Sequence, residues 1–409
     1  MPSVQPVVRA AIAGLLMTLA QIVVAIGLLA PEGPLSARYG TLLQHDSFWF
    51  MNIVERGYST TIPPIEHKVM EVSNVAFFPA YPAIAAALNY GLHIDRGVSL
   101  LLAAQAAAFG FWFYFFLFCE RWNLSPKLRF FGALAIVAHP AAFFLVAGYS
   151  ESLFMMALLG FIYWSNAEGG AARVYAAIHG VLMSGTRIVG IPCAGLPVLQ
   201  TLWEKGWKSL TRPIEWLRQN RWPVTLMIIS TMGAGLFFLY CQVRWGHWDI
   251  YMLTQYAGWA IEPDYLAILR PSSYHWLVPR LSYPTEMSQM AMTTGMLLFV
   301  GMALCELVVA VRRGPVDWPV RAGFYFCAAL IYFVSVSGVA CVEMESMLRY
   351  EFCSHALIVL AFLHFLRQFR NPPAVVRILG TALAVLAIAV GLSVQGWYVW
   401  NFTRGNWVA

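Results

Sequence analysis

Long apolar runs constrain this chain more than any other feature of its sequence. Several extend for about 20 residues, the length that an α-helix needs to cross a bilayer, and the first runs from about Val8 to Ala30. Only 11% of the 409 residues are charged, whereas about 25% are charged in a typical soluble protein. The sequence therefore predicts an all-α, polytopic membrane protein in which residues 1–409 form a single transmembrane domain.

Two segments leave the topology open. Residues 77–92 form a short apolar run that contains Pro79 and Pro82, so this run either crosses the membrane or is re-entrant. Residues 174–199 are long for one crossing and short for two. A re-entrant first segment and a tight hairpin in the second place most bases of the short loops inside, as the positive-inside rule expects. We prefer that version. Both versions give about eleven crossings, with the N-terminus inside and the C-terminus outside.

Three outer segments follow from this topology: residues 31–75, 244–287 and 339–351. The second is rich in Trp and Tyr, which favour the membrane interface, so we expect it to lie on the membrane surface. An ordinary aromatic belt and a groove for a lipid substrate explain this segment equally well.

Charge and cysteine placement exclude other kinds of partner. The net charge is +6, but the bases are spread over short loops instead of forming one patch, so we expect no nucleic-acid partner. The seven cysteines form no CxxC pair, and no His/Asp cluster with the spacing of metal ligands is visible. The sequence therefore predicts no disulfide framework, no metal and no cofactor.

Asp46 is an acidic residue of the first outer segment, placed before an apolar-periodic stretch. If residues 46–56 form a short helix, Asp46, Phe50 and Ile53 share one side, with Trp49 and Arg56 beside them. A carboxylate there can take the proton of a sugar hydroxyl while that oxygen attacks the anomeric carbon of another sugar. The alternative is structural, because Asp before such a stretch is a common helix N-cap.

Ordered motifs between residues 45 and 190 resemble the PIG-V family of mannosyltransferases. They are His45-Asp46 followed by Gly57-Tyr58, then FFPAYP at 77–82, HPAAFF at 139–144, YSESLF at 149–154 and TRIVG at 186–190. The combination of FFPxYP with YSESLF is specific, whereas the second half of the chain matches only in hydropathy and in Leu348-Arg349-Tyr350. Two positions depart from the family pattern, because His45 stands where Trp is usual and His139 where Asn is usual.

The resemblance implies a GT-C fold, which is a helical membrane bundle with its active site on the extracytoplasmic face. It also implies a polyprenyl- or dolichyl-phosphate sugar, typically mannose, as the donor. The implied mechanism is an inverting displacement in which Asp46 deprotonates the acceptor hydroxyl. The leaving lipid phosphate needs cationic or hydrogen-bonding help, and arginines can supply it without a metal.

Two arginines are candidates for contact with that phosphate. Arg187 lies in an apolar segment interrupted by glycines, at the outer tip of the preferred hairpin, and a charge in such a segment is a functional candidate. Arg349 stands among three glutamates, so a local ion pair explains it as well as a phosphate contact. We therefore favour Arg187.

Four further residues are candidates for substrate binding. Glu151, at the junction of an outer segment and a span, either holds sugar hydroxyls or pairs with Arg187. His45 adjoins the proposed base. Tyr58 and Tyr81 are sugar contacts or, equally, packing residues.

These observations favour a glycosyltransferase that moves a sugar, mannose by the resemblance, from a lipid phosphate to an extracytoplasmic glycolipid or glycan. A transporter or flippase is the rival hypothesis, but the chain shows no internal repeat and its distinctive residues gather on one face. A non-catalytic, lipid-binding protein is a third. We expect a monomer among membrane lipids, and the short loops favour a bacterial inner membrane over the ER membrane.

Overall fold

The computed structural model describes residues 4–60, 73–207, 211–313, 318–369 and 373–408, so residues 61–72 of the first outer segment lie outside it. The described residues form helices and no β-strand, as predicted. Within the described ranges, seven helices are long and apolar enough to cross a membrane, namely Val4–Leu29, Arg96–Arg121, Arg221–Trp245, Pro284–Val311, Trp318–Val342, Met347–Leu366 and Ala374–Phe402. The protein is a multi-pass membrane protein, and the total of about eleven crossings stays a prediction.

The chain divides into two compact units. Unit 1 comprises Met1–Leu42, Phe115–Phe144 and Pro263–Ala409, and unit 2 comprises Leu43–Tyr114 and Leu145–Glu262. Helix α6 (Arg96–Arg121) continues from unit 2 into unit 1. That the whole chain acts as one domain stays a prediction.

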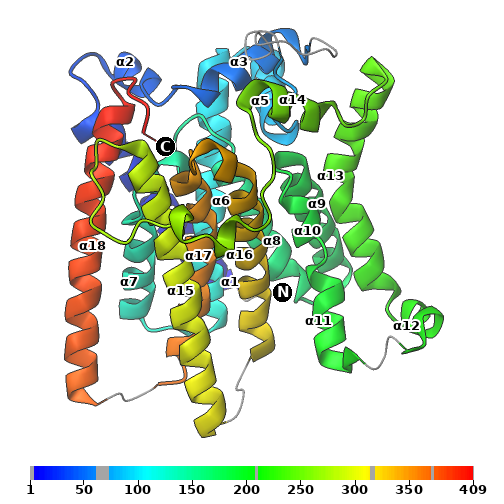
Figure 1. Ribbon diagram of the computed structural model, residues 1–409, viewed down its shortest axis with the longest axis vertical. Helices are drawn as coiled ribbons and strands as arrows, with labels where there is room; N and C mark the ends of the chain where they lie inside the picture. Colours follow the sequence, from blue (N-terminus) through cyan, green and yellow to red (C-terminus); the bar gives the residue numbers. More distant parts are fainter. Residues whose placement is uncertain (1–3, 61–72, 208–210, 314–317, 370–372, 409) are drawn as a thin grey trace. The chain divides into compact units, whose positions relative to one another are not determined.

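Unit 1 is built around helix α17. Its longer elements are α1 (Val4–Ile22) with the π-helical turn η1 (Val23–Leu29), α7 (Pro126–Val137), α15 (Pro284–Arg313), α16 (Trp318–Val339), α17 (Met347–Leu366) and α18 (Ala374–Phe402). The short helices are α2 (Leu35–Gly40), η2 (Ala142–Leu145), η4 (Ala267–Leu269), η5 (Pro271–Ser273) and η6 (Ala340–Val342). Helix α17 packs against α15, α16 and α7, and Figure 1 shows α15, α16 and α17 side by side. Most of α17 is buried, and its buried residues include Arg349, Glu351 and His364 beside many apolar side chains.

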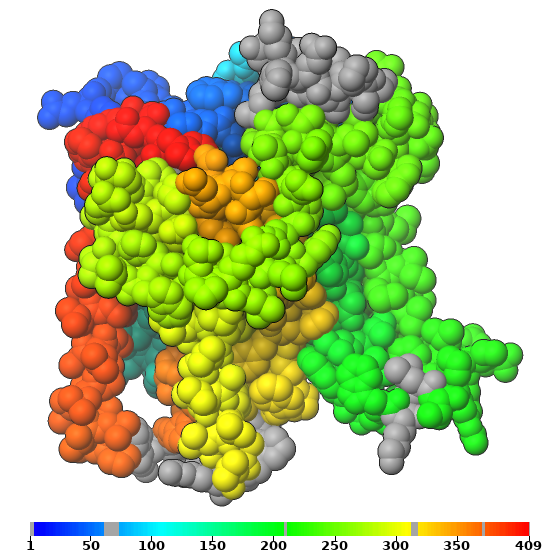
Figure 2. Space-filling view, viewed as in Figure 1, coloured from blue at the N-terminus to red at the C-terminus, as the bar shows by residue number. Residues whose placement is uncertain are grey.

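The part of the second outer segment that belongs to unit 1 folds back on α15 and α16. Ala267 is fully buried in a cluster with Met292 and Tyr332, and Thr293 of α15 bonds the main chain of His275. The segment forms part of the visible surface of this unit, in yellow-green in Figure 2. It exposes large apolar side chains, including Trp276, and its position at a membrane surface stays a prediction.

Unit 2 is built around α9. It contains α3 (Asp46–Arg56), α5 (Ala80–Leu92), α8 (Glu151–Ser165), α9 (Gly170–Thr186), α10 (Gly190–Cys193), α11 (Leu196–Lys205), α12 (Pro213–Gln219), α13 (Arg221–Trp245) and α14 (Ile250–Trp259). Helix α9 packs against both α8 and α13. The contact with α13 is close because Gly233 has no side chain: a Cβ there would lie 2.1 Å from the carbonyl oxygen of Val181.

Helix α5 lies beside α3 along its length. The ring of Tyr81, at its start, is 4.8 Å from the ring of Phe50, and the hydroxyl of Tyr90, near its end, donates to the carbonyl of Val54 at 2.8 Å. Figure 1 shows α3, α5 and α14 gathered at one end of the unit. Both ends of α5 thus contact one short helix, and a re-entrant course for this segment stays a prediction.

Residues 174–199 form a hairpin. Gly185, at the end of α9, lies beside Gly233 in the middle of α13, whereas Lys205, at the end of α11, donates to Asn220 at the start of α13. The chain therefore reverses between α9 and α11, and Arg187 lies in the turn. This arrangement agrees with the preferred prediction.

Candidate active site

Asp46 is the first residue of α3, and the chain is strained just before it. His45 occupies the N-cap position with φ 48° and ψ −109°, and its side chain forms no capping hydrogen bond. Strained backbone of this kind costs about 1–3 kcal/mol and is concentrated at functional sites. Asp46 is itself half-buried and stands in the first turn, where the helix dipole favours a negative charge. His45, and not Asp46, occupies the N-cap position, and the role of Asp46 as a base stays a prediction.

Ser47 fixes the start of α3 against the segment that precedes α8. Its buried hydroxyl donates to the carbonyl oxygen of Gly148 at 3.0 Å. A Cβ on Gly148 would lie 2.8 Å from that hydroxyl and 2.7 Å from Leu43, so only glycine allows this approach. The position of the Asp46 backbone is thereby set by a residue of the YSESLF region.

The apolar side of α3 is buried as predicted. Phe50 and Ile53 belong to one hydrophobic cluster with Tyr81 and Leu100. The hydroxyl of Tyr81 donates to the carbonyl oxygen of Leu100 at 2.9 Å, and the side chain is fully buried. The structure therefore favours packing, one of the two predicted roles, for Tyr81.

Tyr58 makes a similar internal contact. Its hydroxyl donates to the carbonyl oxygen of Phe77 at 2.8 Å, and its ring packs 5.2 Å from that of Phe237. Burial raises the pKa of Tyr58 well above its usual range, so the phenol remains a neutral donor. Tyr58 thus connects the Gly-Tyr motif to the FFPxYP motif, and a sugar contact by Tyr58 stays a prediction.

Trp49, which the sequence placed beside Asp46 without assigning it a role, lies on the same helix as Asp46 and belongs to an aromatic group. Trp49 stacks on Phe77 at 6.0 Å and lies 5.9 Å from the ring of Trp259 in α14. Trp49 is half-buried, so part of its surface faces outward. A large aromatic surface is thus present although His45 replaces the usual Trp. The signal available in the sequence was a Trp one helical turn after His45.

Glu151 and Arg187 form an ion pair between α8 and the turn after α9. A guanidinium nitrogen of Arg187 lies 2.8 Å from a carboxylate oxygen of Glu151, and the two side chains are 18% and 2% exposed. This pairing is one of the two roles predicted for Glu151. A guanidinium carries five N–H donors, so a bond to Glu151 and a contact to phosphate are compatible.

These contacts tie the predicted residues of unit 2 together. Ser47 binds the residue three positions before Glu151, and Glu151 binds Arg187. The starts of α3 and α8 and the end of α9 therefore meet at one end of the unit. These linked segments carry both Asp46, an acid that can accept a proton, and Arg187, a cation in the turn of the hairpin.

Arg349 belongs to unit 1. It lies in the first turn of α17, is 6% exposed, donates to the hydroxyl of Tyr350 at 3.2 Å and lies 5.7 Å from the ring of Phe144. The turn before it is strained, because Glu343 and Ser346 both have positive φ. A contact of Arg349 with phosphate stays a prediction.

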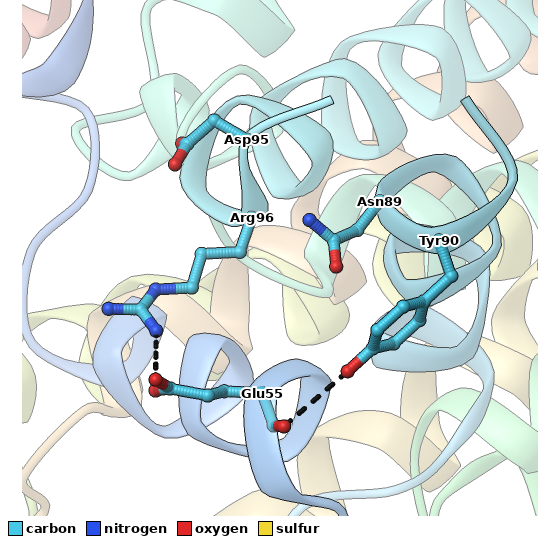
Figure 3. A pocket seen from close by; sticks show the side chains of 5 residues that line it. All are labelled: Glu55, Asn89, Tyr90, Asp95 and Arg96. Carbon is cyan, nitrogen blue, oxygen red and sulfur yellow. Dashed lines mark hydrogen bonds and ion pairs between the residues drawn. The ribbon is translucent and has the colours of Figure 1, made fainter. Parts of the chain in front are cut away.

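A polar hollow of about 320 Å³ lies at the other end of α3 from Asp46. Figure 3 shows its lining, in which Arg96 pairs with Glu55 at 2.5 Å and Tyr90 points toward the end of α3. Asn89 and Asp95 complete it. The hollow presents hydroxyl, amide and carboxylate groups, but none of the predicted site residues lines it.

Comparisons with known proteins agree with the motifs and the helical architecture. The chain is 32% identical over 231 residues to the human GPI alpha-1,6-mannosyltransferase 2, an alignment that covers 52% of this chain and 43% of that protein. The chain thus spans less than half the length of this relative. No protein-family model matches the chain.

The structure is similar to that of ArnT from Cupriavidus metallidurans bound to undecaprenyl phosphate, with a TM-score of 0.50 and 14% identity, over 95% of this chain and 77% of ArnT. The chain has a GT-C fold. The fold prediction and the resemblance to the PIG-V family are therefore confirmed.

Proposed function

We propose that this GT-C chain is a glycosyltransferase that moves a sugar, mannose, from a polyprenyl or dolichyl phosphate to a glycolipid or glycan at the extracytoplasmic face. The observation that carries the proposal is Asp46: a half-buried carboxylate at the strained start of α3, held in place by the bond from Ser47 to Gly148. The similarity to a human mannosyltransferase supports the sugar. The shared fold with ArnT, which was solved with undecaprenyl phosphate, supports a lipid-phosphate donor.

In the proposed reaction Asp46 accepts the proton of an acceptor hydroxyl. The oxygen then forms a bond to the anomeric carbon of the donor sugar, and the bond from that carbon to the phosphate oxygen breaks with inversion. The electron pair leaves with the lipid phosphate. Arg187 stabilises the charge that develops there, and Glu151 orients the guanidinium.

The short loops of the chain support a bacterial inner membrane as its location. In that location the acceptor is a cell-envelope glycolipid or glycan. The chain acts as a monomer in this proposal, because Asp46, Glu151 and Arg187 all lie within unit 2.

The test is a transfer assay with the full chain in nanodiscs. Polyprenyl-phosphate mannose, labelled in the sugar, is supplied with an extract of membrane glycolipids, and the products are separated by mass spectrometry. We expect equal amounts of free polyprenyl phosphate and of an acceptor that has gained one hexose. The same chain in sealed vesicles, which enclose a compartment as nanodiscs do not, tests the rival: movement of the intact donor across the vesicle membrane, without either product, would establish the transporter hypothesis instead.

A further inference from the structure

A carboxylate and two histidines meet inside unit 1, among residues that the proposed transfer does not use. His139 follows α7, whereas Glu351 and His355 stand one helical turn apart on α17. One potential ligand atom of each residue lies within 4.8 Å of the others. The side chains of His139 and Glu351 are 7% and 1% exposed. His139 is also the position at which this chain departs from the Asn of the family motif.

Hydrogen bonds define the proton positions in this cluster. His355 Nε2 lies 3.2 Å from the carbonyl oxygen of Ala135, so it carries the proton and leaves a lone pair on Nδ1. His139 Nδ1 accepts the N–H of Ala141 at 3.1 Å, so the proton of this ring is on Nε2, which donates to Glu351 Oε2 at 2.7 Å. Two acceptor atoms remain, Glu351 Oε1 and His355 Nδ1. Both are buried, and neither has a hydrogen-bond partner among the residues that the structure describes.

A buried carboxylate in a membrane helix is costly unless a positive charge balances it. Imidazole nitrogen and carboxylate oxygen are ligands that Zn²⁺ prefers. In metal sites the ligating His usually donates its other N–H to a backbone carbonyl, and the ligating carboxylate is itself hydrogen-bonded. Here His355 donates to the backbone carbonyl of Ala135, and Glu351 accepts a hydrogen bond from His139.

We propose that Glu351 and His355 bind a divalent transition-metal ion of the Zn²⁺ type, with His139 holding the second carboxylate oxygen. This proposal differs from the sequence-based expectation of no metal. The spacing missed the cluster because His139 is 212 residues from Glu351, and the only local signal was an acid and a histidine four residues apart on one helix.

The ion would have a structural role. Both ligands stand on α17, so the ion would hold two adjacent turns of that helix, and the bond from His139 to Glu351 would join them to the segment after α7. The same two segments are already joined by the contact between Arg349 and Phe144. Arg349 lies two residues before Glu351, so the ion would stabilise the part of α17 that presents this arginine.

The first experiment measures metal content. The full chain, carrying an affinity tag without histidines, is placed in nanodiscs, equilibrated with Zn²⁺ and freed of unbound ion by gel filtration before elemental analysis. We expect close to one ion per chain, and loss of that ion in Glu351→Gln and His355→Gln. His364→Gln is the matched control, because His364 is also buried on α17 but lies outside the cluster, and it should keep the ion. His139→Asn should weaken metal binding by about 10–100-fold, as expected for a residue that hydrogen-bonds a ligand without contacting the ion.

A second experiment does not depend on the folding of a variant. A chelator should lower the thermal unfolding midpoint of the unaltered protein, and Zn²⁺ should restore it. X-ray absorption should show nitrogen and oxygen ligands at about 2.0–2.2 Å and no sulfur near 2.3 Å. The proposal is overturned if the unaltered protein holds no ion and the chelator leaves its thermal unfolding midpoint unchanged. It is also overturned if both ligand variants keep the ion, or if sulfur appears, since Cys353 is close in sequence.

Discussion

The ion pair between Glu151 and Arg187 predicts an asymmetric response to mutation. The Glu151 side chain is 2% exposed and that of Arg187 is 18% exposed. Arg187→Gln leaves a carboxylate that water cannot reach, and removing one partner of a buried pair costs about 3–5 kcal/mol. Glu151→Gln leaves a guanidinium that is partly hydrated, so we expect a smaller loss, about 1–3 kcal/mol.

The double variant separates this explanation from simple loss of contacts. With both charges gone, no uncompensated charge is buried, so Glu151→Gln combined with Arg187→Gln should be more stable than Arg187→Gln alone. The assay is the thermal unfolding midpoint of each variant in the same nanodiscs, compared with the unaltered chain. Equal losses in the two single variants, or a double variant that loses the sum of both, would refute the reasoning.

Two further predictions concern glycines. Gly233→Ala should strongly lower the unfolding midpoint, because its Cβ would lie within 2.5 Å of backbone atoms of α9, whereas Gly235→Ala, with no atom within 4 Å, should not. Gly148→Ala should affect the rate of sugar transfer more strongly than the unfolding midpoint, because the new Cβ pushes on Ser47 beside the proposed base. A displacement of about 1 Å can cost about 100-fold in rate. Gly91→Ala in α5 meets no neighbour and should leave that rate unchanged; equal rates in the Gly148 and Gly91 variants would contradict this interpretation.

Hydropathy and local pattern predicted the features that depend on neighbouring residues. The apolar runs predicted the helices, and the proline-containing run and the glycine-interrupted run were recognised as segments whose course through the membrane is open. The side of α3 formed by Phe50 and Ile53 is buried as its periodicity indicates. These features follow from composition over a few turns of helix, which a sequence displays directly.

Contacts between distant segments were harder to predict. The pairing of Glu151 with Arg187 was one of two alternatives, because nothing in the sequence tells which way each side chain points. Trp49 was seen only as a neighbour of Asp46, and its stacking on Phe77 and Trp259 depends on the fold of three separate segments. The meeting of His139 with Glu351 was missed for the same reason.

The central claim is that Asp46 is the catalytic base, and one measurement tests it most directly. The rate of polyprenyl phosphate release with acceptor present is compared between the unaltered chain, Asp46→Asn and Asp95→Asn. Asp95 caps α6 through bonds to Gly97 and Val98, and Asn caps equally well, so this control should keep its activity. We expect Asp46→Asn to fold normally and to lose about 10²–10⁴-fold in rate, the usual contribution of a general base. An Asp46→Asn protein that folds and keeps the full rate would contradict the account.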